Sequence, residues 1–200
     1  MKRVAEIHPG DLYINWVLHA IYGKLAEADH IMRVGGKAIR WVADCLNDKQ
    51  PIEPKPIYRG MLLDPSKPFK LEPSLTFMSW SEDQYVARWF ASSYSYISKP
   101  LIAAKPELRG YLATAIIPSS RVLWHHSWTN LFGGDLASCA LLHPMMGPEG
   151  ARQIAWSLEV QREVITEPFE LAPEPILGDV TLEVDRKLTP KWITDEEFAS

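Results

Sequence analysis

The chain changes character abruptly after its first quarter, and this change constrains the fold more than any other feature of the sequence. Before residue 50, apolar side chains recur at the three- and four-residue spacing of helices. Prolines at positions 51, 54 and 56 then exclude a continuing helix. Most later segments are short apolar runs bounded by proline, glycine or serine, which is typical of strands. Helices followed by strands favour an α+β fold over a doubly wound parallel sheet.

The first quarter predicts two helices. The first runs from an expected N-cap at Asp11 to about Leu25. The second covers 31–46, although Gly35 and Gly36 at its centre weaken the helical propensity of this stretch.

The later segments predict a sheet with one helix packed on it. The expected strands are 57–62, 75–80, 111–117, 121–124, 163–166 and 180–184. An amphipathic helix over 82–92 interrupts them, with Val86 and Trp89 available to pack on the sheet. The glycine-rich region 124–157 is expected to form functional loops, and 124–135 within it is a candidate lid over a ligand.

Size and charge narrow the class of protein. The 200 residues fit a single domain over 1–200, with a helical part over 1–50 and a core over 55–185. The formal net charge of -4 disfavours a protein that coats nucleic acid through counterion release. No apolar stretch is long enough to cross a bilayer, and the first residues lack the apolar region of a signal peptide. We therefore expect a cytoplasmic protein that makes no membrane contact.

The sequence gives little support to disulfide or metal chemistry. Cys45 and Cys139 are too few for a disulfide framework and too isolated for a zinc motif. His125 and His126 are adjacent at the end of an expected strand, so their side chains should point to opposite faces. We therefore expect no metal pair there.

Three short segments, far apart in the chain, carry polar residues that stand out. The first is Tyr58-Arg59-Gly60, which places a cation in an otherwise apolar strand. The second is Ser79-Trp80-Ser81, followed by a helix that contains Ala87-Arg88-Trp89-Phe90-Ala91. The third is Gln161-Arg162-Glu163, whose first and last side chains would share a face in an extended chain. Taken singly, each has an ordinary explanation: a rim arginine, a serine cap of a helix, and a solvated strand edge.

Together, the order and spacing of these segments resemble the arginine–serine–glutamate class of mono-ADP-ribosyltransferases, which includes toxin-like and bacteriophage-like enzymes. That family has an aromatic-Arg-Gly strand, a Ser-Thr-Ser strand leading into an Ala-x-x-Phe-Ala helix, and a Glu/Gln-x-Glu strand. The resemblance covers about 55–185 and departs from the family at Trp80, where threonine is usual. It implies a split, mixed or antiparallel sheet with an N-terminal helical segment, NAD as the substrate, and no metal.

The resemblance also assigns roles to residues of this chain. Arg59 would hold the NAD pyrophosphate or the neighbouring ribose through charge-assisted hydrogen bonds. Gly60 would let the backbone approach the nicotinamide carboxamide, and Ser79 would orient Glu163. Glu163 would bind the ribose 2′-hydroxyl and stabilise the oxocarbenium-like charge that develops as the nicotinamide bond breaks. Further residues expected to bind NAD are Tyr58, Ser81 and Phe90.

Gln161 is expected to influence the choice of acceptor. In the family, glutamate at this position accompanies transfer to arginine, whereas glutamine resembles enzymes that modify asparagine, glutamine or guanine. A glutamine amide can both donate to and accept from another amide or a base edge. We therefore favour a protein Asn or Gln side chain, or a nucleobase, over Arg. Trp156 could stack on a flat acceptor or pack in the core, and the sequence leaves both roles open.

The main prediction is thus an enzyme that transfers ADP-ribose from NAD to a macromolecule. The resemblance points to a bacterial or bacteriophage protein that modifies machinery in the host cytoplasm. The alternative is a catalytically inert module of the same fold that inhibits a partner protein by occlusion. The 8 tryptophans would then mark an interface, whereas the presence of Arg59, Ser79 and Glu163 favours the enzyme.

Overall fold

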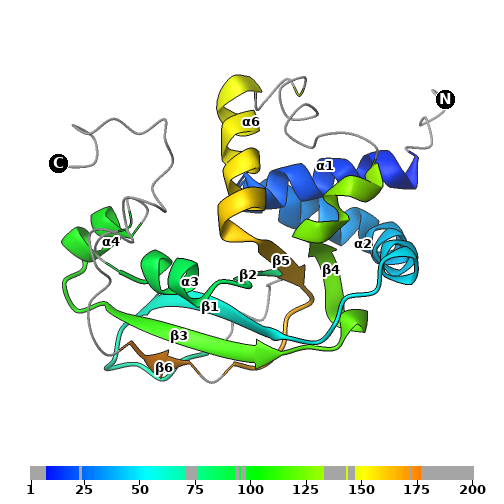
Figure 1. Ribbon diagram of the computed structural model, residues 1–200. Helices are drawn as coiled ribbons and strands as arrows, with labels where there is room; N and C mark the ends of the chain where they lie inside the picture. The colour runs from blue at the N-terminus through cyan, green and yellow to red at the C-terminus, as the bar shows by residue number, and fades with distance from the viewer. Residues whose placement is uncertain are drawn as a thin grey trace.

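The computed structural model describes residues 8–22, 24–70, 76–92, 95, 98–132, 143, 147–171 and 173–176. Six strands within these ranges form one sheet in the order β4-β5-β2-β1-β3-β6, and each of their pairings is antiparallel. Helices pack against this sheet, so the α+β prediction is confirmed (Figure 1). The strands are β1 (Pro56–Leu63), β2 (Met78–Ser81), β3 (Arg109–Ile116), β4 (Val122–His125), β5 (Glu163–Thr166) and β6 (Glu174–Pro175).

Helices occupy both the start of the chain and the links between strands. The α-helices in the described ranges are α1 (Pro9–Ile21), α2 (Leu25–Lys49), α3 (Gln84–Phe90), α4 (Lys99–Ala104) and α6 (Gly147–Trp156). The shorter turns are the 3₁₀ segments η1 (Ser119–Arg121) and η2 (His126–Phe132) and the π-helical segment η3 (Ser157–Gln161).

The first two helices, α1 and α2, pack against each other. Their boundaries differ from the expected ones. α1 begins at a cap on His8, whose Nδ1 accepts a hydrogen bond from the amide two residues later at 3.2 Å. Asp11 lies in the first turn instead, so its prediction as the cap was wrong. Leu25 is 57% exposed and begins α2. A Cβ on Gly35 would lie 2.4 Å from Leu12 Cδ2, so this glycine lets α1 and α2 pack closely.

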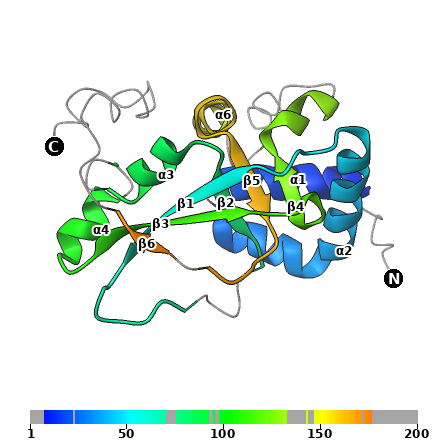
Figure 2. The same ribbon diagram turned by 60° about the horizontal axis from the view of Figure 1, so that its bottom comes forward.

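The main core lies between this helix pair and the β4-β5-β2 half of the sheet (Figures 1 and 2). Tyr13 anchors α1 to the sheet, because its hydroxyl donates to the carbonyl of Leu123 at 2.5 Å. Tryptophans supply much of the buried volume, which is the ordinary role of this side chain. Six of them are buried: Trp16, Trp80, Trp89, Trp124, Trp128 and Trp156.

α3 covers the other half of the sheet and lies directly on β1. Asp83 caps this helix by accepting from the amide of Tyr85 at 2.8 Å. The helix therefore starts later than the expected 82, and Ser81 belongs to β2. The close approach of α3 requires a glycine at position 60, because a Cβ there would lie 1.8 Å from the carbonyl oxygen of Ala87.

Other sequence predictions have mixed outcomes. β5 has the expected bounds, and the bounds of β1 to β4 lie within three residues of the expected ones. No strand was expected at the position of β6. The strand expected over 180–184 lies outside the described residues. Among the helices that the structure describes, none has the combination of length and apolar character that a membrane span requires.

Candidate functional site between the two halves of the sheet

The two halves of the sheet meet at a single position. β1 pairs with β3 at eight positions and β2 pairs with β5 at four, but β1 and β2 pair only through Tyr58 and Ser81. Beyond this pair the two strands diverge, and a cavity of about 480 Å³ lies along the edge of β1 that faces β2. The backbone of Gly60 is part of its wall.

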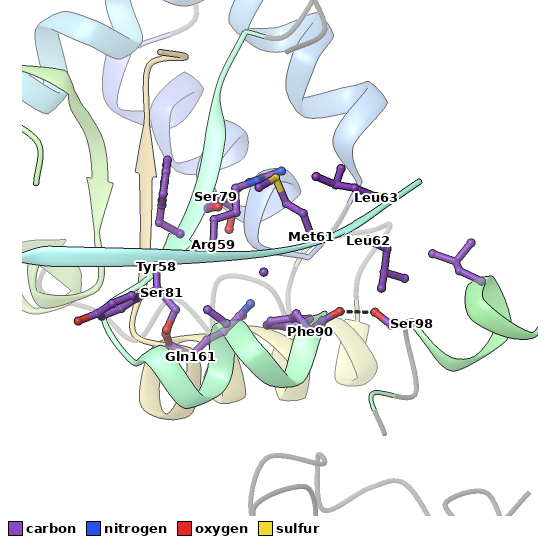
Figure 3. Close-up of a pocket in the computed structure, with 14 residues that line it drawn as sticks. Tyr58, Arg59, Met61, Leu62, Leu63, Ser79, Ser81, Phe90, Ser98 and Gln161 are labelled. Atoms are coloured by element: carbon purple, nitrogen blue, oxygen red, sulfur yellow. Dashed lines mark hydrogen bonds between the residues drawn. The ribbon is translucent and has the colours of Figure 1, made fainter. Parts of the chain in front are cut away.

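Residues from several elements line this cavity, as Figure 3 shows. They are 58–63 of β1, 79–81 of β2, Ala87 and Phe90 of α3, Ser98 and Leu101 at α4, and Gln161. The side chains of β1 alternate, as they do in any strand. Arg59 lies on the side of Ser79, whereas Tyr58 lies on the side of Phe90 and Gln161 (Figure 3).

Arg59, Ser79 and Glu163 meet where β1, β2 and β5 come together. The Nη1 of Arg59 donates to the carbonyl of Ser79 at 2.5 Å. The hydroxyl of Ser79 donates to Oε1 of Glu163 in a short hydrogen bond. The cation, the hydroxyl and the carboxyl group predicted from three separate motifs therefore form one connected cluster. Glu163 adjoins the cavity through Ser79 and is not itself part of the cavity wall.

The carboxyl group of Glu163 is in an unusual environment. The residue is 3% exposed, and its Oε2 is buried with no hydrogen-bond partner. Burial raises the pKa of this carboxyl to about 8, although the Ser79 hydroxyl and the charge of Arg59 oppose the rise. Burial also lowers the pKa of Arg59, and Glu163 opposes that shift. A buried carboxyl with a strongly raised pKa beside a cavity is a typical feature of functional sites.

The third motif is not an extended segment, so the prediction for 161–163 was wrong in its geometry. Gln161 is the last residue of η3, and Arg162 then adopts a left-handed conformation with φ 46 and ψ 56. This conformation costs a non-glycine residue roughly 1 kcal/mol or more. Gln161 nonetheless lines the cavity. The Ser81 hydroxyl holds this turn by donating to the carbonyl of Gln161 at 2.6 Å.

Two tryptophan-containing segments lie in the core instead of over the cavity. Trp156 is 7% exposed, and its ring centroid is 5.9 Å from that of Trp89 and 6.1 Å from that of Phe90. This placement fits the core-packing alternative. In the candidate lid 124–135, Trp124 and Trp128 are fully buried in the main core, and residues 133–135 lie outside the described ranges.

A polar cluster centred on Glu82 was not expected from the sequence. Nε2 of His125 lies 2.8 Å from Glu82 Oε1, and Nε2 of His126 lies 3.0 Å from Glu82 Oε2. The expectation that the two histidines point to opposite faces was wrong, because β4 ends at His125 and the chain turns into η2 at His126. Their rings stack, with centroids 4.6 Å apart. Glu82 is 43 residues earlier, so no local spacing could have revealed the contact.

Comparisons with protein-family models, with curated protein sequences and with solved structures found no match for this chain. A functional proposal therefore depends on the geometry of the site and on the motifs themselves.

Proposed function

We propose that this protein is an NAD-dependent mono-ADP-ribosyltransferase. The observation that carries the proposal is the contact of Ser79 with both Arg59 and the buried carboxyl of Glu163 at the edge of the 480 Å³ cavity. The three motifs that predict this cluster lie far apart in the sequence.

The cluster has the groups that NAD cleavage requires. The guanidinium of Arg59 has five N–H donors, of which Nη1 bonds Ser79, and the others suit the oxygens of a pyrophosphate. The Oε2 of Glu163 has no hydrogen-bond partner, so it can accept from a ribose 2′-hydroxyl. Because Glu163 lies behind Ser79 and outside the cavity wall, its carboxyl must turn past Ser79 to reach that ribose. Gly60 brings the backbone of β1 to the cavity wall, where it can meet the nicotinamide carboxamide.

In the proposed reaction, the bond between ribose C1′ and the nicotinamide nitrogen breaks, and nicotinamide leaves with the electron pair. Positive charge develops on the ribose, and the Glu163 carboxylate stabilises it through the 2′-hydroxyl more strongly in the transition state than in the ground state. The acceptor nucleophile then attacks C1′ and loses its proton. A preorganised charged group of this kind typically contributes about 10²–10³ in rate.

Gln161 is the residue from which we infer the acceptor. Gln161 lines the cavity, so its amide can meet an amide or a base edge at the point of transfer. We therefore propose a protein Asn or Gln side chain, or a nucleobase, as the acceptor, in host machinery in a bacterial cytoplasm. The alternative of an inert interface module loses its main sequence argument, because six of the tryptophans are buried.

The decisive experiment incubates the full chain with labelled NAD and a bacterial lysate. The E163Q variant should lose transfer to the lysate while it keeps its fold and much of its NAD binding. E159Q is the matched control, because Glu159 is exposed and lies only four residues away. Equal labelling by the wild type and E163Q would remove Glu163 from the mechanism. Mass spectrometry of the labelled product then identifies the acceptor.

A further inference from the structure

We propose that Glu82, His125 and His126 form a binding site for a divalent transition metal such as Zn²⁺. The site lies beside the proposed NAD site, because Glu82 directly follows Ser81 in the chain. It is independent of NAD chemistry, and it can be tested without any measurement of transfer.

The spacing of the candidate ligand atoms supports a shared metal ion. One nitrogen from each histidine and one carboxylate oxygen all lie within 4.8 Å of one another. Neighbouring ligand atoms in a tetrahedral zinc site are roughly 3.3 Å apart, given bond lengths of about 2.0–2.2 Å. The Glu82 carboxylate lies between the two nitrogens, with Nε2 of His125 at 2.8 Å from Oε1 and Nε2 of His126 at 3.0 Å from Oε2, and a bound ion would replace these two contacts.

The nature and burial of the candidate ligands also support a metal site. Two imidazoles and one carboxylate are a common zinc ligand set, and they leave a fourth position open. The side chains of Glu82 and His125 are each 6% exposed, and that of His126 is 21% exposed.

Ser127 orients His125, one of the proposed ligands, through the ring nitrogen that does not face Glu82. The Nδ1 of His125 lies 2.8 Å from the hydroxyl of Ser127, and this contact directs Nε2 toward Glu82. The Ser127 amide also donates to Nδ1 at 3.2 Å, so in the metal-free form Nε2 carries the proton. Metal binding at Nε2 requires the tautomer with the proton on Nδ1, so the Ser127 amide would lose its contact with Nδ1 while the Ser127 hydroxyl accepts from it.

Lys55 is the competitor for the metal. Its Nζ lies 2.5 Å from Glu82 Oε1, so the ammonium neutralises the carboxylate in the metal-free form. The Lys55 side chain is 49% exposed and flexible, so it can swing into solvent when an ion binds. The effect of removing Lys55 distinguishes a metal site from a simple ion-pair network. Removal of Lys55 would weaken a network but strengthen metal binding.

The experiment titrates the metal-free full chain with Zn²⁺ by calorimetry and with Co²⁺ by visible absorption. We expect one ion per chain and a tetrahedral Co²⁺ spectrum. H126A should weaken Zn²⁺ binding at least about tenfold, and K55M should tighten it by several-fold. H30A is the matched control, because His30 is an exposed histidine on α2.

Circular dichroism of the metal-free variants checks that each is folded. K55M changes an exposed side chain, so its result stays interpretable even if H126A fails to fold. Binding that is equal in the wild type and H126A, or that K55M weakens, would overturn the proposal. So would the absence of stoichiometric Zn²⁺ binding. None of these outcomes bears on NAD transfer, so a failure here leaves the proposed function unaffected.

Discussion

At the scale of single residues, Glu163 couples the stability of the fold to the chemistry of the site. Its pKa is raised from 4.5 to about 8, chiefly by burial. Between these two pH values the folded chain holds a proton that the unfolded chain has released. The contribution of this group to stability is therefore complete below about pH 4.5 and is lost progressively as the pH rises toward 8.

The E163Q variant should remove this pH dependence, because glutamine is neutral throughout. We expect the free energy of unfolding of E163Q to exceed that of the wild type by an amount that grows from pH 5 to pH 8, on the order of a few kcal/mol in total. The difference should level off at higher pH. Urea unfolding at several pH values measures it, with E159Q as the exposed control. Parallel stability curves for E163Q and the wild type would show that the carboxyl is ionised in the fold.

The same pKa predicts the pH dependence of NAD cleavage. In the proposed mechanism only the carboxylate form of Glu163 stabilises the developing positive charge, so kcat/KM should rise with pH, with a midpoint near 8. The S79A variant removes a hydrogen bond that lowers this pKa, so its midpoint should move to higher pH. Nicotinamide release in the absence of an acceptor measures both profiles. A profile that is flat between pH 6 and pH 9 would contradict the assignment of Glu163.

The sequence identified Arg59, Ser79 and Glu163 because each lies in a short local motif. It misplaced Gln161 because nothing in the identity of Arg162 signals a left-handed backbone. This turn is imposed by its surroundings, including the hydroxyl of Ser81, which lies 80 residues earlier.

At the scale of elements, prediction succeeded where a local pattern decides the structure. β5 is a short apolar strand, and α2 keeps its helical period through Gly35 and Gly36. α3 begins later than expected because Ser81 pairs with Glu163 in the β2–β5 ladder instead of capping the helix. A short stretch of sequence can indicate a serine that precedes a helix. It cannot indicate that the same serine pairs with a strand far along the chain.

Two glycines allow a test of how closely the elements pack. A Cβ on Gly60 would lie 1.8 Å from a backbone carbonyl of α3, whereas a Cβ on Gly36 meets nothing closer than 3.8 Å. G60A should therefore push α3 away from β1 and destabilise the fold by about 1–3 kcal/mol or more. G36A should stabilise it by about 0.5–1 kcal/mol, because alanine is favoured in a helix interior. Urea denaturation of both variants measures the changes. Equal effects of the two substitutions would contradict this packing.

At the scale of the whole molecule, the sequence predicted the α+β class, and the motif resemblance implied a mixed or antiparallel sheet, but neither predicted the order of the strands. Helices before strands indicated α+β, yet the order β4-β5-β2-β1-β3-β6 places β2 beside β5, which lies more than 80 residues later. Such pairings are set by long-range packing, and a single sequence does not encode them in any local pattern. The divergence of β1 from β2, which creates the cavity, has the same origin.

Because Arg59 on β1 bonds Ser79 on β2, it joins the two halves of the sheet as well as facing the proposed ligand. R59A should lower the melting temperature of the free protein, since Ser79 loses a charged donor. NAD at one hundred times its Kd should stabilise the wild type by about 2.7 kcal/mol.

We expect R59A to lose most of this NAD-dependent stabilisation and R59K to retain part of it, because lysine keeps the charge but not the planar set of donors. R152A, which changes an exposed arginine of α6, is the control. Thermal unfolding with and without NAD measures each shift against the melting temperature of the same variant without ligand. This comparison distinguishes the loss of the Arg59–Ser79 contact between the two halves of the sheet from the loss of NAD binding. If NAD raised the melting temperature of R59A as much as that of the wild type, the pyrophosphate would not bind at Arg59 on β1. The cavity between the two halves of the sheet would then have no assigned ligand.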